Sequence, residues 1–359
     1  MKAVARLLGI GLTAIAIAMP VPPALAQLQL TPQVSPAKKS ESGVKKRQDA
    51  KKSAPKKDPQ KSSQKPKAPP AAEPATEDPG VDLAYGAYQR GAYGTAFRLA
   101  SKRAQELADP KAMTLLGELY ANGQGVNRDD AKAADWYKQA ADRGDREATF
   151  ALAMLRIAGR GTPANRDEGA KLLAFAARLG SAPAAYNLAL LNIEGQIFPQ
   201  NLPRAAELFR QAADAGNPQA QYALATFYKE GRGVEKDLAE AARLLKAAAL
   251  GDSLDAQVEY AIALFNGTGT PKDEAAAVAL LWKAARRGSP IAQNRLARVL
   301  AYGIGAPKDM TEALKWHLIA KSGGNGDPGL DELFAPMSAE NRQKAEDGAR
   351  RWFGVKLAK

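Results

Sequence analysis

A repeat of 36 residues constrains this chain more than any other feature. Four positions recur at this interval in six consecutive copies without a shift in register. They hold an alanine (Ala112, Ala148, Ala184, Ala220, Ala256, Ala292), a glycine (Gly123, Gly159, Gly195, Gly231, Gly267, Gly303), an Asp or Asn (Asp129, Asn165, Asn201, Asp237, Asp273, Asp309) and a second alanine (Ala140, Ala176, Ala212, Ala248, Ala284, Ala320). A fixed period of this length predicts a solenoid of stacked supersecondary units.

The copy from Asn217 to Gly251 shows what each unit contains. Apolar residues recur at helical spacing in its first half and again in its second half, namely Ala220, Leu224, Phe227 and Tyr228, then Leu244, Leu245, Ala248 and Ala249. The segment Gly231–Gly233 separates the two halves, Asp237 is placed to cap the second helix, and Gly251 ends it. The unit is therefore predicted to be a helix, a turn and a second helix.

Each recurring residue type has a physical role in such a unit. Alanine allows two helix backbones to approach closely, because a larger side chain would hold them apart. Glycine at the end of the first helix takes a left-handed conformation without steric cost. Asp or Asn accepts hydrogen bonds from the first free backbone N–H groups of the second helix.

These residues resemble the consensus of the Sel1-like repeats, which are related to tetratricopeptide repeats. The copy from Ala112 to Gly144 matches best, through Leu116, Gly117, Tyr120, Gly123, Gly125, Val126, Asp129, Ala133, Trp136, Tyr137, Ala140, Ala141 and Gly144. The resemblance covers about Pro110 to Gly324. It implies an all-α fold, a right-handed α-solenoid of helical hairpins, and a shared scaffold rather than a shared reaction.

The segments on either side of the six repeats (110–324) are predicted to cap the solenoid. Residues 81–109 read as an irregular helical hairpin, and residues 325–359 contain an amphipathic helix that Ser338 can cap. Its apolar face would contain Ala345, Ala349, Trp352 and Phe353. Within the array, Ile197 replaces the second turn glycine of the other repeats, so the turn of the third repeat is expected to differ.

The first 80 residues differ from the rest in composition. Residues 1–26 resemble a secretory signal, with Lys2 and Arg6 before a short apolar run and an A-x-A site at Ala24–Ala26. Residues 27–80 are rich in Lys, Pro and Ala and are predicted to be a disordered basic linker. Between Lys38 and Lys67, 12 basic residues face three acidic ones. This arm is either a solvated spacer or a tether to anionic lipid or wall polymer.

No constellation for catalysis stands out in the sequence. The chain has no cysteine and one histidine, His317, at a position where the repeat carries a packing residue. Zinc sites of the common types and nucleophilic triads therefore lack their side chains, and we expect no catalytic, metal or cofactor site. Cysteine-rich relatives of the family are described as penicillin-binding or hydrolysing, but this chain lacks their cysteines. A hydrolase acting on the cell wall is the least favoured hypothesis.

The first helix of each repeat lines the concave side in the related tetratricopeptide fold. By that resemblance, two rows of residues would face inward, one containing Thr114, Phe150, Tyr186, Tyr222, Val258 and Asn294, the other Glu118, Met154, Leu190, Thr226, Ile262 and Arg298. The centre of these rows is apolar, as in a groove for a partner helix or peptide. The predicted partner-binding residues are Phe150, Met154, Tyr186, Leu190, Tyr222, Thr226, Val258 and Ile262. The alternative is that they pack between repeats.

Together these patterns predict a non-enzymatic scaffold that is exported, to the periplasm or beyond the cell, and binds a protein or peptide partner. The export signal and the absence of aromatic residues in the arm argue against a nucleic-acid partner. The resemblance implies roles such as regulation of sensor kinases or support of envelope and polysaccharide assembly. The alternative is a structural protein that binds the wall or envelope through its basic arm.

Overall fold

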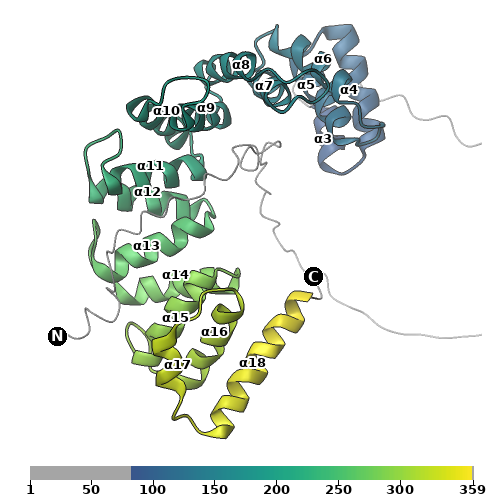
Figure 1. The fold of residues 1–359 in the computed structure, drawn as a ribbon. Coiled ribbons are helices and arrows are strands. Elements are labelled where there is room, and N and C mark those ends of the chain that lie inside the picture. The colour runs from purple at the N-terminus through teal and green to yellow at the C-terminus, as the bar shows by residue number, and fades with distance from the viewer. Residues whose placement is uncertain (1–81, 358–359) are drawn as a thin grey trace, which may run out of the picture.

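The structure, a computed structural model, describes residues 82–357 of the 359-residue chain. The expected signal sequence and basic linker lie outside the described residues. Within this range every regular element is a helix, and consecutive helices pack as antiparallel hairpins in a right-handed superhelix (Figure 1). The first hairpin is α3 (Leu83–Gln89) and α4 (Tyr93–Leu107), and the last elements are α17 (Pro328–Phe334) and α18 (Ala339–Leu357).

Six regular hairpins lie between these ends, each with a first and a second helix. The first helices are α5 (Pro110–Asn122), α7 (Arg146–Ala158), α9 (Ala182–Glu194), α11 (Pro218–Glu230), α13 (Leu254–Asn266) and α15 (Pro290–Tyr302). The second helices are α6 (Asp130–Ala141), α8 (Arg166–Arg178), α10 (Leu202–Asp214), α12 (Leu238–Leu250), α14 (Glu274–Arg286) and α16 (Met310–Ser322). The predicted fold class is confirmed.

Side-chain caps fix where these helices begin. Each Asp or Asn predicted to cap a second helix accepts a backbone N–H of the first turn, as Asp237 does from Ala239 and Glu240. Such a cap typically stabilises a helix by about 1 kcal/mol. The first helices are capped in the same way, by Asp109, Asp145, Ser181, Asn217, Ser253 and Ser289. The sequence analysis did not single out this second series.

Two glycines in each turn explain the tight spacing of the hairpins. The glycine that ends each first helix is left-handed, with φ between 66° and 72°. The second turn glycine lies against the preceding hairpin, since a Cβ on Gly269 would be 1.8 Å from the carbonyl oxygen of Leu238. The third repeat has Ile197 at this position, and its φ is not positive. Its turn therefore differs from the others, as predicted.

The end of α12 differs from the ends of the other second helices in one detail. Gly251 is the C-cap residue of this helix, as expected, and its φ is −75°, which is not left-handed. The left-handed residue is Asp252, with φ of 68°, at the position where other repeats have Gly144, Gly180 or Gly288. The glycine lies one residue early in this repeat because a Cβ at position 251 would meet Pro218 at 2.7 Å.

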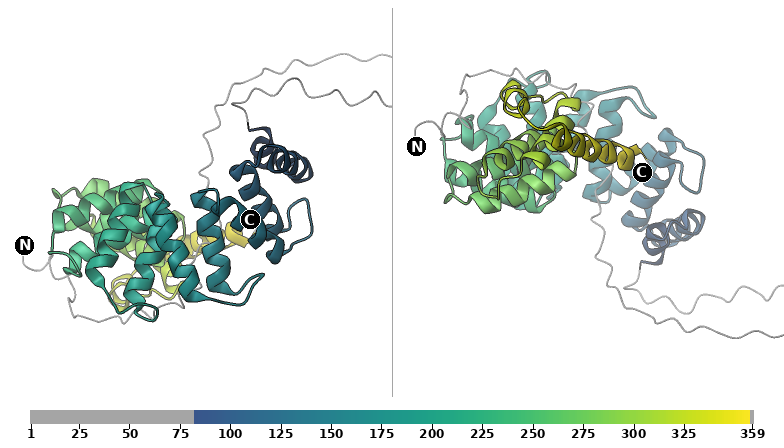
Figure 2. Two further views of the ribbon diagram at one scale, coloured as in Figure 1. Left: turned by 90° about the horizontal axis from the view of Figure 1, so that it is seen from above. Right: turned by 90° about the horizontal axis from the view of Figure 1, so that it is seen from below.

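Alanines form the contacts between helix backbones. Eleven of the twelve recurring alanines are fully buried, and Ala112 at the start of the array is 4% exposed. The stacked hairpins produce a curved, twisted arc, and α5, α7 and α9 lie on its inner side relative to α6, α8 and α10 (Figures 1 and 2). Among the described helices, none combines the length and the apolar character that crossing a membrane requires.

The C-terminal end of the array is covered by α18. Ala345 and Ala349 of this helix are buried, and its Trp352 ring lies 5.2 Å from that of Trp316 on α16. The Ser338 hydroxyl accepts a hydrogen bond from the backbone of Asn341, as expected of a cap. Phe353 was predicted on the same apolar face but is 37% exposed. That prediction was wrong because one residue beyond Trp352 rotates the side chain away from α16.

Candidate functional site

The predicted partner-binding residues divide into two groups in the structure. Phe150, Met154 and Val258 are buried, which fits packing between repeats. The others keep part of their surface exposed, namely Tyr186, Leu190, Tyr222, Thr226 and Ile262. The Tyr186 ring packs 5.6 Å from that of Phe209, so even a half-buried member has a structural contact. Partner binding by these residues remains a prediction.

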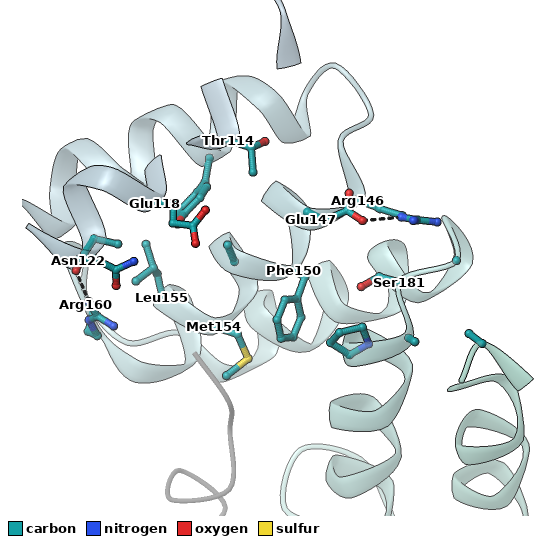
Figure 3. Close-up of a pocket in the computed structure, with 17 residues that line it drawn as sticks. Thr114, Glu118, Asn122, Arg146, Glu147, Phe150, Met154, Leu155, Arg160 and Ser181 are labelled. Atoms are coloured by element: carbon teal, nitrogen blue, oxygen red, sulfur yellow. Dashed lines mark hydrogen bonds and ion pairs between the residues drawn. The ribbon is translucent and has the colours of Figure 1, made fainter. Parts of the chain in front are cut away.

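A pocket of about 350 Å³ lies at the N-terminal end of the inner face, between α5, α7 and the start of α9 (Figure 3). Phe150, Met154 and Leu155 of α7 form apolar walls, and Ser181 and Pro183 border it from α9. Thr114 and Glu118 contribute from α5. The pocket opens here because the inner-face positions of the first repeat hold these two residues, whereas the third repeat holds the larger Tyr186 and Leu190.

Glu118 is the unusual residue of this pocket. Its Oε1 accepts a hydrogen bond of 2.9 Å from the Tyr88 hydroxyl of α3, so the capping hairpin contributes to the site. Burial raises the pKa of Glu118, and the Tyr88 hydrogen bond lowers it by a smaller amount. Burial also raises the pKa of Tyr88, with the nearby Glu118 charge adding to the effect. No Lys, Arg or His within residues 82–357 forms an ion pair with Glu118.

The two arginines that border the pocket are both paired elsewhere. Arg160 donates to both carboxylate oxygens of Asp130, at 2.7 and 3.0 Å, and this links the first two repeats. Its hydrogen bonds hold the pKa of Asp130 at about 2. Arg146 donates to Glu147 at 2.7 Å. Both arginines of the rim are therefore held in ion pairs, while the carboxylate of Glu118 points into the pocket and forms no ion pair within residues 82–357 (Figure 3).

Sequence reasoning found half of this site. Phe150 and Met154 were predicted as partner-binding residues, and both line the pocket. Thr114 and Glu118 were placed on the inner face but left out of the predicted site because the end of the rows is polar. The signal that would have indicated the pocket was a small polar residue one helical turn before a carboxylate, at positions where the third repeat has the larger Tyr186 and Leu190.

Other chemically distinctive groups are accounted for by packing. His317 is fully buried, its Nε2 lies 2.8 Å from Asp331 Oδ1, and its ring lies 5.7 Å from that of Phe334. These contacts join α16 to α17. Over residues 82–357, the structure contains no group of three or more His, Asp or Glu side chains placed to hold a metal ion.

Known structures of similar fold support the architecture. The chain is similar to c5321, a protective antigen of uropathogenic Escherichia coli strains with an SLR fold, at 27% identity and a TM-score of 0.66. The match covers 76% of this chain and 60% of that one, so this chain spans about 60% of the length of that relative. It is also similar to a Sel1 repeat protein from Oxalobacter formigenes, at 27% identity and a TM-score of 0.55, covering 66% of this chain and 94% of that one. No curated protein sequence matches the chain.

The family assignment follows from the repeats themselves. The Sel1 repeat matches residues 110–145, 146–181, 182–217, 218–253, 254–289 and 290–325, which together exceed half of the chain. Solenoids of this type are typical of scaffolds that bind protein partners, and the fold is generally non-catalytic. The chain belongs to the Sel1 repeat family.

Proposed function

We propose that this protein is an exported, periplasmic, non-enzymatic scaffold whose inner face binds a partner protein or peptide. The observation that carries the proposal is the pocket between α5, α7 and α9, which combines apolar walls with the buried carboxylate of Glu118. Concave sites with apolar walls and a few polar groups are the usual places where proteins bind ligands. The hydrophobic start of the chain supports export.

Site-specific photo-crosslinking in cells tests this function. A photoreactive amino acid at Thr114, which lines the pocket, should capture a discrete protein partner. The matched control is Leu250 at the end of α12, which is 79% exposed and lies outside the pocket. The proposal fails if position 114 captures nothing, or only the proteins that position 250 also captures. Fractionation of cells, with and without residues 1–26, tests export separately.

The basic arm supports a second candidate function, contact with an anionic surface. The excess of basic residues between Lys38 and Lys67 is the observation that favours it. Deleting residues 29–75 should lower retention of the chain on anionic lipid vesicles or wall fragments at low salt, because the attraction is electrostatic and is screened by salt. Equal retention with and without residues 29–75 would contradict this function and leave the arm as a spacer.

A further inference from the structure

We propose that the pocket binds the cationic side chain of a lysine or arginine on the partner, with its charged group at Glu118 and its aliphatic stem against Phe150 and Met154. The inference rests on the proposed function and specifies which chemistry the inner face recognises. It assigns Glu118 and Tyr88 a role in recognition.

The balance of charges in the pocket favours a cation. Four charged residues line it, and two of them, Arg146 and Glu147, neutralise each other. A third, Arg160, forms an ion pair with Asp130, a carboxylate that also pairs with Arg128. Glu118 is the remaining charged residue, a half-buried carboxylate without an ion pair in the described residues, and a carboxylate that loses water without gaining a partner is costly. A carboxylate or phosphate ligand would be repelled by Glu118, and a purely apolar ligand would remove its remaining water without replacing it.

The hydrogen bonds around Glu118 leave room for a donor from the partner. Tyr88 occupies Oε1, and Oε2 has no hydrogen-bond partner within the described residues. A carboxylate accepts about four hydrogen bonds. An ammonium or guanidinium group supplies several donors of the required charge, and ionic hydrogen bonds of this kind are about twice as strong as neutral ones.

The size and walls of the pocket suit one or two side chains rather than a whole helix. Its volume of about 350 Å³ is near the lower end of the range of about 300–1,000 Å³ for small-ligand pockets. Phe150 and Met154 lie near each other on α7, and Leu155 lies nearer to Glu118 (Figure 3). Lysine and arginine side chains have apolar stems of three or four methylenes that pack on such walls while the charged end reaches a polar group.

A titration monitored at Met154 tests the inference. The probes are two capped pentapeptides, acetyl-Ala-Ser-Lys-Ser-Ala-amide and the same peptide with norleucine, which keeps the stem of lysine without its charge. The full chain is labelled at its methionine methyl groups, and the Met154 signal reports binding in the pocket. We expect the lysine probe to bind about tenfold more tightly than the norleucine probe, which corresponds to about 1.4 kcal/mol.

Two variants distinguish recognition from general electrostatics. Glu118→Gln should remove the preference for lysine and leave weak binding of the norleucine probe. Glu235→Gln, an exposed carboxylate in the turn between α11 and α12, changes the net charge equally and should keep the preference. The lysines of the arm can compete for the pocket, so the titration is repeated on the chain without residues 38–67. Tighter binding of the lysine probe there also supports a cation site.

The inference is overturned if the wild-type chain binds the lysine and norleucine probes equally, both with and without residues 38–67. It is also overturned if Glu118→Gln retains the preference for lysine. The first comparison uses no variant and holds even if Glu118→Gln does not fold. The proposed function is judged separately by the crosslinks at position 114. If a partner is captured but the pocket shows no preference for lysine, only the proposal of a cation site is contradicted. If the pocket prefers lysine but no partner is captured, only the proposed scaffold function is contradicted.

Discussion

The two ends of the inner face have the same repeat but different packing. At the N-terminal end, α5, α7 and α9 leave a pocket of about 350 Å³. At the C-terminal end, the space between α13 and α15 is about 20 Å³, enough for about one water molecule but not for a side chain. Position for position, Thr114 and Glu118 of α5 correspond to Val258 and Ile262 of α13. The difference shows that the same repeat can leave a pocket between its first helices at one end of the array and fill that space with side chains at the other.

Contacts beyond the last repeat help to close the C-terminal end. The side-chain amide of Asn294 donates to the carbonyl of Asn325 at 3.2 Å, and Arg298 pairs with Asp327. Both partners lie in the segment that leads to α17. At the other end, the Thr114 hydroxyl bonds only to the carbonyl of Pro110 in its own helix, at 2.9 Å. The first repeat thus keeps the surface at Thr114 available, although its Glu118 accepts a hydrogen bond from Tyr88 of α3, whereas the last repeat uses both equivalent positions in contacts with the capping segment.

The buried charges at the two ends also have opposite sign. Arg295, at the filled end, has its pKa lowered by burial, and its Nε has no hydrogen-bond partner within the part of the chain that the structure describes. Glu118, at the open end, has its pKa raised by burial. Only Glu118 borders a pocket large enough to admit a partner's side chain. The comparison therefore supports the proposal that a partner binds at the N-terminal end, whereas the C-terminal end is packed.

Replacing equivalent tryptophans should give the largest effect. Trp316 is 2% exposed, lies between the rings of Trp282 and Trp352, and donates to Glu312 at 2.8 Å. Trp316→Ala should cost about 3–5 kcal/mol, because it removes a fully packed aromatic ring. Trp136 holds the same repeat position at the open end but is only half-buried, so Trp136→Ala should cost less than about 2 kcal/mol. Urea denaturation measures the free energy of unfolding of both variants. Equal losses of stability would contradict the conclusion that the C-terminal end is the more tightly packed of the two.

A double replacement at the centre of the inner face tests how far the binding surface extends. Tyr222 and Leu190 are both half-buried and belong to the predicted partner-binding residues. Tyr222→Ala with Leu190→Ala should weaken capture of the crosslinked partner by roughly thirtyfold, or about 2 kcal/mol, because truncating an anchor residue typically has this cost. Circular dichroism must show a folded variant first. Undiminished capture would restrict binding to the pocket.

The sequence predicted the scaffold well because its determinants are local. Capping by Asp237 and a left-handed Gly231 depend on short stretches of chain, and both were found as predicted. The pocket is a volume that the side chains of three helices leave unfilled. The repeat pattern of the sequence does not predict such a volume. The hydrogen bond from Tyr88 to Glu118 joins residues 30 positions apart, across the boundary between an irregular hairpin and the first repeat. The repeat pattern holds no information about such a contact.

The pH dependence of stability should reveal the buried carboxylate of the open end. The groups around Glu118 are Tyr88 of α3, Tyr137 of α6 and Arg146, Glu147 and Arg160 from α7 and its turn. A raised pKa means that the folded state holds this proton more tightly than the unfolded state does, so the stabilisation is lost as the pH rises through the folded pKa. Relative to Glu118→Gln, the wild type should therefore be less stable at pH 7.5 than at pH 4.5.

Thermal unfolding of the wild type and Glu118→Gln across this range measures the difference. Glu235→Gln is the control, because it makes the same change in net charge at an exposed position. A stability difference between the wild type and Glu118→Gln that stays constant with pH would show that Glu118 ionises as it does in the unfolded chain.

The smallest expected effect concerns the ion pair at the rim of the pocket. Asp130 and Arg160 bridge the first two repeats, and their side chains are 19% and 23% exposed. Asp130→Asn should cost about 1 kcal/mol, less than its lowered pKa alone would indicate, because the pair is partly exposed and its charges are screened. The equivalent residue at the filled end is Glu274, whose partner Lys272 is 58% exposed, and Glu274→Gln should cost less than about 0.5 kcal/mol.

An acid titration tests whether the stability lost in Asp130→Asn comes from the charge of Asp130. The pKa of Asp130 is held at about 2, below its ordinary value of 3.8, so its contribution is complete above pH 3.8 and disappears as the pH falls towards 2. The stability difference between the wild type and Asp130→Asn should accordingly shrink from pH 4 downwards. A difference that survives well below pH 2, where Asp130 is protonated in the folded state as well, would mean that Asp130 acts by shape rather than by charge.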